Sequence, residues 1–161
     1  MKSAILALIA SVALAADHGF PNDDAFHASC HMTATLTGAS CADAKAKADQ
    51  LIKDNVDTDS EYKGQMSIKD EGDDWIWSKR LTYNKKYTDD QLFEFTTSGS
   101  DCAVAARSKS ESMSYLDNNV NYCNMWNVIS RIDGFSQDSV SASKYGSNTP
   151  PSDPVTKCAR Y

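Results

Sequence analysis

Five cysteines in a chain of 161 residues are the feature that most constrains how it can fold. No two of them form a Cys-x-x-Cys pair, so their spacing gives no sign of a zinc ribbon or a thioredoxin-like redox site. In an oxidising compartment such cysteines form disulfides, which stabilise small domains. Because the number is odd, one thiol stays free or bonds to another chain. The candidates are Cys30, Cys41, Cys102, Cys123 and Cys158.

The first fifteen residues predict that oxidising compartment. Lys2 supplies a positive start, residues 3–14 carry no charge, and Ala13-Leu14-Ala15 has the small-x-small pattern of a cleavage site. The apolar run is shorter than the roughly 20 residues that a transmembrane helix needs. We therefore expect a signal peptide over residues 1–15, a secreted, extracellular mature protein and no transmembrane segment.

The spacing of the cysteines leaves their pairing open. We favour a bond between Cys102 and Cys123, because it would join a predicted strand to the helix packed on it. A bond from Cys158 to Cys30 or Cys41 would then hold the C-terminal segment against the domain. Closing such long loops stabilises a domain by on the order of 3–5 kcal/mol in the entropic model. The fifth cysteine allows a disulfide-linked dimer.

Hydrophobic periodicity predicts five strands and two helices. Residues 41–54 carry apolar side chains at helical spacing and follow Ser40, a good N-cap. Residues 119–133 repeat the helical pattern, and Gly134 is expected to end it. The strands are expected where apolar and polar residues alternate, over residues 29–37, 61–70, 74–84, 91–97 and 102–113.

These elements predict a single α+β domain over residues 29–136. Consecutive strands joined by short turns form antiparallel sheets. We expect a two-layer sandwich, in which an antiparallel sheet of about five strands carries both helices on one face. Residues 16–28 are expected to form a polar N-terminal arm. Over residues 137–161 Ser, Gly, Asn and Pro dominate, which predicts a solvated tail tethered near Cys158.

The charge balance argues against several classes of partner and chemistry. The chain has 22 acidic and 16 basic residues, a net charge of -6 and no basic block, which argues against a nucleic-acid partner. Acidic pairs at residues 23–24, 73–74 and 89–90 fall beside predicted turns, and solvated acids rarely give the contrasting environments of a catalytic acid and base. The run Asp57-x-Asp59-x-Glu61 lacks the glycine and glutamate of a calcium loop. No catalytic or nucleotide motif is present, so we expect neither enzymatic activity nor a cofactor.

The three histidines all lie near the N-terminus, where we expect them at the surface of a loose arm: His18, His27 and His31. Cleavage after Ala15 would place His18 at position three of the mature chain. An amine, two amides and an imidazole so arranged can chelate Cu(II) or Ni(II) in a square plane. We otherwise expect no metal site, and this one depends on the position of a single cleaved bond.

The most unusual stretch runs from residue 106 to residue 127. Every second residue from Ser108 to Ser114 is a serine, which places four hydroxyls on one face of a strand. This polar strip is either a sheet edge followed by a helix that Asp117 or Asn119 caps, or a contact surface for a polar ligand. The residues that we expect to contact such a ligand are Arg107, Ser108, Ser110, Asp117 and Asn121.

The same stretch resembles the signature of the domain of unknown function 1499, a bacterial and plastid family. Arg107, Ser108 and Ser110 match the start of its Arg-Ser-x-Ser-Arg pattern, although Glu111 stands where the second arginine is expected. Asp117 and Asn121 match its later acid and amide. The resemblance covers roughly residues 41–132. It implies a fold and a strip of interest, but no reaction, because the activity of that family is itself unknown.

We therefore expect a secreted, disulfide-stabilised binding or interaction module, whose partner is a small molecule or an extracellular protein or glycan. Trp75 and Trp77 belong either to the core beneath a helix, which we favour, or to a sugar-stacking platform. One alternative is a carrier of a small apolar ligand in a cavity between sheet and helix, lined by Trp77, Leu81, Phe93 and Trp126. Another is an extracellular structural or coat subunit, cross-linked through the odd cysteine.

Overall fold

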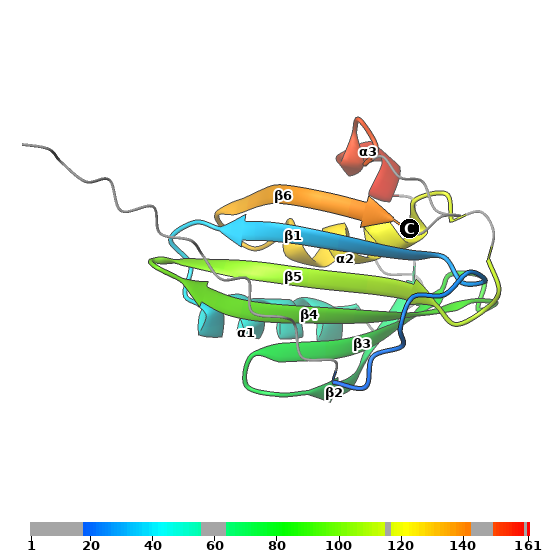
Figure 1. The fold of residues 1–161 in the computed structure, drawn as a ribbon, viewed down its shortest axis with the longest axis horizontal. Coiled ribbons are helices and arrows are strands. Elements are labelled where there is room, and N and C mark those ends of the chain that lie inside the picture. Colours follow the sequence, from blue (N-terminus) through cyan, green and yellow to red (C-terminus); the bar gives the residue numbers. More distant parts are fainter. Residues whose placement is uncertain (1–17, 56–63, 115–116, 143–149, 160) are drawn as a thin grey trace, which may run out of the picture.

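A computed structural model describes residues 18–55, 64–114, 117–142, 150–159 and 161 of the chain (Figure 1). The predicted signal peptide over residues 1–15 and the acidic run over residues 57–61 lie outside the described residues. The elements follow one another as β1 (Ser29–Leu36), α1 (Cys41–Asp54), β2 (Gly64–Glu71), β3 (Trp75–Thr82), β4 (Thr88–Ser98), β5 (Asp101–Ser110), α2 (Val120–Ile129), β6 (Phe135–Ala142) and α3 (Pro154–Cys158).

The strands form one antiparallel sheet in the order β2-β3-β4-β5-β1-β6. Strands β2 to β5 are neighbours in sequence and in space, whereas β1 lies between β5 and β6. The α+β class and the antiparallel sheet are therefore confirmed. The expected five strands and two helices become six and three within the described residues.

The sixth strand corrects the prediction of a solvated tail. Residues 137–142 belong to β6, which pairs with β1 along its length. Polar side chains alternate with the half-buried Phe135 and Val140, which pack against the core. The connection into β6 passes Gly134, whose φ is +77° and where a Cβ would lie 2.3 Å from the Thr37 carbonyl oxygen. The helix before it ends at Ile129, earlier than predicted.

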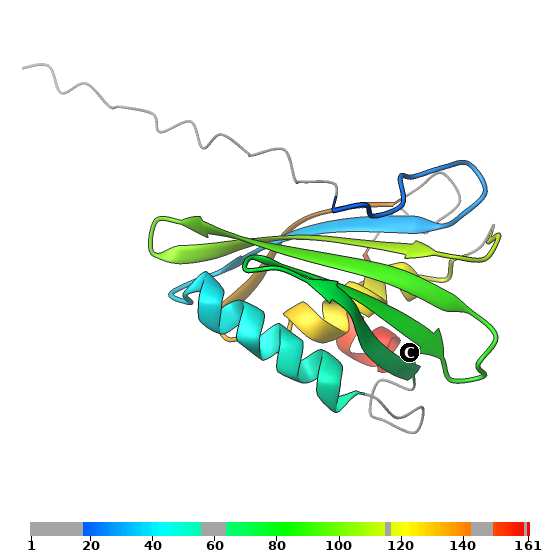
Figure 2. The same cartoon turned by 90° about the horizontal axis from the view of Figure 1, so that it is seen from below.

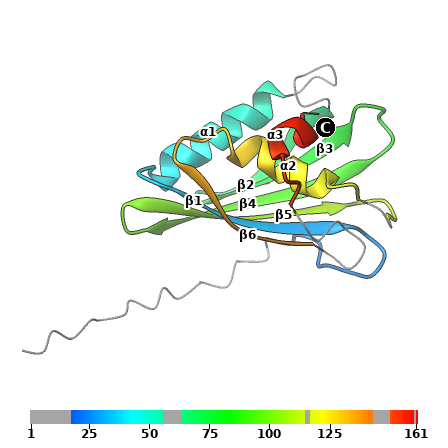
Figure 3. The ribbon, with the colours of Figure 1, turned by 90° about the horizontal axis from the view of Figure 1, so that it is seen from above.

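All three helices lie on one side of the sheet (Figures 2 and 3). Helix α1 begins where predicted, because the Ser40 hydroxyl accepts a hydrogen bond from the Asp43 backbone N–H at 3.1 Å. Its buried stripe is Ala44, Ala48 and Ile52, at the spacing of one helical face. No helix among the described residues is long and apolar enough to cross a membrane.

One disulfide joins a helix to the sheet and a second joins two helices, and their pairing differs from the prediction. Cys41 bonds to Cys102, and Cys123 bonds to Cys158. The favoured bond between Cys102 and Cys123 is wrong because Cys102 lies at the start of β5, beside the first residue of α1. The expected bond from Cys158 to Cys30 or Cys41 is also wrong, since Cys158 bonds to Cys123 and so joins α3 to α2.

The free thiol is that of Cys30, which is 2% exposed. Burial raises its pKa to about 12, and the nearby charge of Asp117 adds to the shift. A buried, protonated thiol is not a nucleophile. The hypothesis of a dimer linked through the odd cysteine is therefore not supported, because Cys30 cannot reach another chain while β1 stays in the sheet.

The N-terminal arm over residues 18–28 covers the opposite face of the sheet (Figures 2 and 3). Its Phe20 is buried against Trp77, with ring centroids 5.4 Å apart. Trp77 therefore belongs to a small apolar cluster beneath the arm, and its expected position beneath a helix is wrong. The alternation of β3 is as predicted, but the helices cover the face that carries Ile76.

The histidines are held by acids instead of lying on a loose arm. His18 stacks on Trp75 at 4.2 Å and lies 3.4 Å from Glu94. His27 contacts Asp24, and His31 on β1 contacts Asp23, each at 2.8 Å. Ala16 and Asp17 lie outside the described residues, so the Cu(II) or Ni(II) hypothesis stays a prediction. Among the described residues, no group of three His, Cys, Asp or Glu side chains is arranged to hold a metal ion.

Candidate functional site

Two rows of polar residues cross the helix-facing side of the sheet near the ends of β3, β4 and β5. In the first row, Asp89 pairs with Arg80 on one side and Ser110 on the other. In the second row, Gln91 pairs in the same way with Ser78 and Ser108. All six are buried. Because side chains two positions apart share one face of a strand, this polar region continues directly from the apolar core.

Helix α2 supplies polar side chains that hydrogen-bond to three residues of these rows, Ser108, Ser110 and Asp89. Asn121 accepts a hydrogen bond from the Ser108 hydroxyl at 2.7 Å, and its amide nitrogen donates to Ser110 Oγ at 3.2 Å. Asn124, one turn later, donates to Asp89 Oδ2 at 2.9 Å. The Ser110 hydroxyl donates to the other oxygen of Asp89 at 2.8 Å. The network accounts for the burial of Asn121 and of the Asn124 amide nitrogen, since buried polar groups are tolerated when hydrogen-bonded.

Asp117 completes the network where α2 begins. Its carboxylate accepts hydrogen bonds from the Asn121 backbone N–H at 3.1 Å and from the Asn121 side chain at 2.6 Å. Asn118 and Asn119 both have positive φ, so the chain turns sharply into the helix. Asn119 is the N-cap by backbone geometry but caps with no side-chain bond. Asp117 therefore satisfies the first turn of α2, as one of the two predicted caps.

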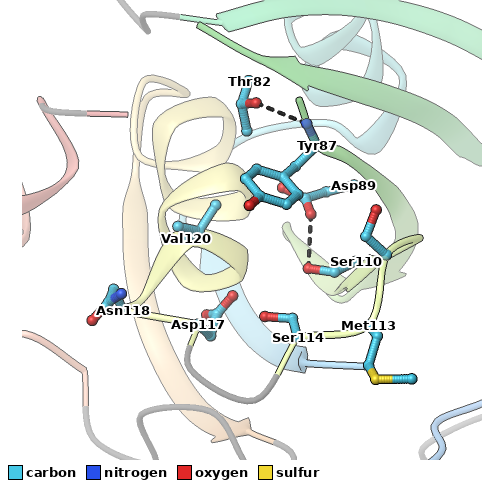
Figure 4. Close-up of a pocket in the computed structure, with 10 residues that line it drawn as sticks. Thr82, Tyr87, Asp89, Ser110, Met113, Ser114, Asp117, Asn118 and Val120 are labelled. Atoms are coloured by element: carbon cyan, nitrogen blue, oxygen red, sulfur yellow. Dashed lines mark hydrogen bonds between the residues drawn. The ribbon is translucent and has the colours of Figure 1, made fainter. Parts of the chain in front are cut away.

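A pocket of about 340 Å³ opens over this network, between the start of α2 and the ends of the strands. Figure 4 shows the Asp117 carboxylate and the Ser110 and Ser114 hydroxyls directed toward its interior, and the Tyr87 ring and Asp89 also line it. Val120 forms part of the wall on the α2 side. Pockets that hold small molecules start at roughly 300 Å³ and combine apolar walls with a few fixed polar groups. The site therefore suits a small ligand.

Both carboxylates of the pocket are more weakly acidic than usual. Burial raises the pKa of Asp117 to about 6, and the negative charge of Asp89 adds to the effect. Burial also raises the pKa of Asp89, although hydrogen bonds from Asn124 and Ser110 and the charge of Arg80 oppose it. The floor of the pocket therefore consists of carboxyl groups, and the one on Asp117 changes between its protonated and ionised forms at pH values near 6.

Four of the five predicted contact residues meet in this network. Ser108, Ser110, Asp117 and Asn121 are joined by the hydrogen bonds described above. Arg107 is not part of it. Its neighbour in sequence, Ser108, faces the helices, so Arg107 faces the arm, where it lies 3.7 Å from Glu94 and over the Phe20 ring.

The serine strip is neither a sheet edge nor an open surface. Strand β5 lies between β4 and β1 and ends at Ser110, three residues earlier than predicted. Ser108 and Ser110 are buried beneath α2, and the next serines, Ser112 and Ser114, line the pocket beyond the strand. The alternation correctly grouped the hydroxyls, but it did not indicate that a polar helix covers the first two.

Sequence analysis missed Asp89, Asn124 and Tyr87 as site residues. Asp89 was expected in a solvated turn, but β4 begins at Thr88, and both Asp89 and its neighbour Asp90 are buried. The signal for Asp89 was present, since it shares the alternation of Gln91 and Phe93. To recognise Asp89 as a site residue, one has to know that it pairs with Ser110 across the sheet, and the sequence alone does not reveal that pairing.

The residues expected to line an apolar cavity do not meet. Phe93 lies in the core beneath the helices, with Trp126 packed against that core. Trp77 lies in the cluster beneath the arm, on the opposite face of the sheet, and Leu81 shares its strand and its alternation. The set that defined the carrier hypothesis is therefore divided between two faces, and the hypothesis loses its lining residues.

Comparison of the chain with protein-family models, with curated proteins and with solved structures finds no match. The resemblance to the domain of unknown function 1499 stays a prediction. The functional argument accordingly depends on the geometry and electrostatics of the pocket.

Proposed function

We propose that this protein is a secreted binding module that holds a small polar ligand in the pocket between α2 and the ends of β3, β4 and β5. The observation that carries the proposal is that two buried carboxylates, those of Asp89 and Asp117, line the same pocket, whose volume of about 340 Å³ is large enough for a small ligand. Burying charged groups is costly unless their environment compensates for it. Buried ionisable groups in a cleft are more frequent at functional sites than elsewhere.

The arrangement favours binding over catalysis. A catalytic acid and base need environments that move their pKa values apart. Here burial raises the pKa of Asp89 and the pKa of Asp117 in the same direction. Both carboxylates are also fixed by neighbouring amides and a hydroxyl, which orients their oxygens as hydrogen-bond acceptors. These features suit recognition of a donor-bearing ligand.

An extracellular location is supported by two independent features. The apolar, uncharged run over residues 3–14 precedes a small-x-small cleavage pattern. The two disulfides, Cys41–Cys102 and Cys123–Cys158, are of the kind that persists in oxidising environments. The structural or coat-subunit alternative loses its cross-linking residue, because Cys30 is buried.

The proposal is tested by thermal denaturation with a panel of small compounds that includes methyl glucoside, glycerol, glycine, n-butylammonium and butyrate. At least one class should raise the melting temperature of the native protein and have no such effect on Asp117→Asn. The matched control is Asp73→Asn, which removes the same charge from an exposed turn residue and should respond like the native protein. Stabilisation that is identical in all three proteins, or absent in all, contradicts the proposal.

A further inference from the structure

The charged side chains that line the pocket are both acidic. Ten residues line it, and of these only Asp89 and Asp117 carry a charge. The remaining lining residues are neutral, with hydroxyls from Ser110, Ser112 and Ser114 among them. A ligand that enters this space therefore meets hydrogen-bond acceptors and negative potential, and an anionic ligand is repelled.

The two carboxylates differ in how their charge is compensated. Asp89 lies opposite Arg80 in the register between β3 and β4, and although burial raises the pKa of Asp89, the positive charge of Arg80 opposes that rise. Asp117 receives its hydrogen bonds from the neutral Asn121. Among the described residues, none of the ion pairs formed by Lys, Arg or His involves Asp117. Asp117 is the carboxylate whose charge a ligand can neutralise.

The surroundings of Asp117 define the rest of the ligand. The Ser110 and Ser114 hydroxyl oxygens are directed into the same space as its carboxylate (Figure 4). These oxygens can accept the additional N–H bonds of a group with three donors. The Tyr87 ring and the Val120 side chain form apolar wall beside them, which suits a short hydrocarbon chain and, at the ring, a cation.

We propose that the ligand of this pocket is a small organic cation whose primary ammonium group binds Asp117 and whose hydrocarbon part packs against Tyr87 and Val120. The inference rests on the proposed function and names the ligand class of the same pocket. A metal ion would be expected to gather more acidic, histidine or cysteine ligands than this pocket offers, and within the described residues no such group of three exists.

The ionisation of Asp117 makes the binding depend on pH. The titratable and charged groups around it are Asp89 on β4, Tyr87 in the pocket wall, Arg80 beyond Asp89 on β3, and Cys30 on β1. Between pH 5 and pH 7.5 the Cys30 thiol, with its pKa of about 12, stays protonated and neutral, and the Arg80 guanidinium stays charged. With a pKa of about 6 for Asp117, lowering the pH from about 7.5 to about 5 should weaken the binding of an ammonium ion about tenfold.

The test uses n-butylammonium chloride, with butan-1-ol and sodium butyrate as neutral and anionic probes of similar size. Binding to the full secreted protein is followed by the backbone amide shifts of residues 110–114 and 117–121 in NMR spectra at pH 7.5. Butylammonium should move these signals saturably, and the affinity for butan-1-ol should be lower by a factor of about ten or more. Asp117→Asn should abolish the preference for the cation, whereas Asp73→Asn should keep it.

Each other result overturns the inference in a distinguishable way. If butan-1-ol or methyl glucoside binds at these amides as tightly as butylammonium, the ligand is neutral and the proposed function stands without this inference. If calcium chloride moves the same signals at lower concentration than butylammonium, the pocket is a metal site. If no probe moves them, both proposals fail. The pH dependence is measured on the native protein, so a poorly folded Asp117→Asn still leaves a decisive result.

Discussion

The helix-facing side of the sheet has two halves, one lined by apolar side chains and the other mainly by polar side chains. In the apolar half, neighbouring strands contribute Ile76, Phe93, Ala106 and Met32 to one row. Two residues further along, the row consists of Ser78, Gln91, Ser108 and Cys30. Both halves are covered by helices and both are buried. The difference lies in what holds them, since packing stabilises the first half and hydrogen bonds stabilise the second.

This comparison teaches that the polar half is retained at a cost in stability. Replacing a buried hydrogen-bonded network by well-packed apolar groups is often neutral or stabilising. A network that includes two carboxylates and opens to a pocket is therefore better explained by what it can bind than by what it adds to folding. Three measurements would break or sharpen the comparison.

The largest effect is expected in the apolar half. Phe93 is fully buried, and Phe93→Ala should lower the free energy of unfolding by about 3–5 kcal/mol, because it removes packed surface and leaves a cavity. The measurement is urea unfolding followed by tryptophan fluorescence. The control is Thr96→Ala on the same strand, where the side chain is exposed and the cost should stay below about 0.5 kcal/mol. Equal costs would show that this half is not the packed core.

A smaller effect is expected at the centre of the polar half. Asn121→Ala removes the partners of Asp117 and Ser108 at once, and should cost about 2–4 kcal/mol because buried polar groups are left unsatisfied. Ser108→Ala added to it should cost less than it does in the native protein, since the shared bond is already lost. Asn22→Ala, in an exposed part of the arm, is the control. Strict additivity would mean that the network is not a unit.

The smallest effect is expected in the way the free energy of unfolding depends on pH. The pKa of Asp117 is about 6 in the folded protein against an ordinary value of 3.8, so the folded state binds the proton more tightly. The free energy of unfolding should therefore fall as the pH rises from about 4 to about 6, by on the order of 2–3 kcal/mol from this group. The raised pKa of Asp89 acts in the same direction.

The variant that isolates this slope is Asp117→Asn, compared with Asp73→Asn by urea unfolding at several pH values. The difference between native protein and Asp117→Asn should change between pH 4 and pH 6 and be constant below that range. Parallel curves for the native protein and Asp117→Asn would show that burial does not raise the pKa of Asp117, and the pH dependence proposed for binding in the pocket would be wrong.

The fold was predictable where one residue pattern has one structural outcome. Ser40 followed by apolar residues at helical spacing specified α1, and alternation specified the strands β1, β3 and β4. Strand β6 was missed because an edge strand is held through its backbone, so its side chains can remain polar. Alternation also left the faces undetermined, because a period of two separates Trp77 from Ile76 without stating which of them the helices cover.

The candidate site was half predictable for a related reason. Ser108, Ser110, Asp117 and Asn121 are close in sequence, so their pattern could be recognised. Asp89 reaches them only through the pairing of β4 with β5, and the disulfide from Cys102 to Cys41 depends on how α1 lies across the sheet. Contacts between segments far apart in the chain are set by tertiary packing, which spacing alone does not encode.

The position of β1 in the sheet has a consequence for how the chain reaches its native state. This strand is made before the other five, yet its neighbours are β5 and β6, which follow it by more than sixty residues. During synthesis β2 to β5 can pair as successive hairpins, whereas residues 29–36 stay unpaired, with their apolar side chains exposed, until β5 has been made. Pairings between segments so distant in sequence slow folding, and they leave apolar surface exposed to chaperones and to other nascent chains.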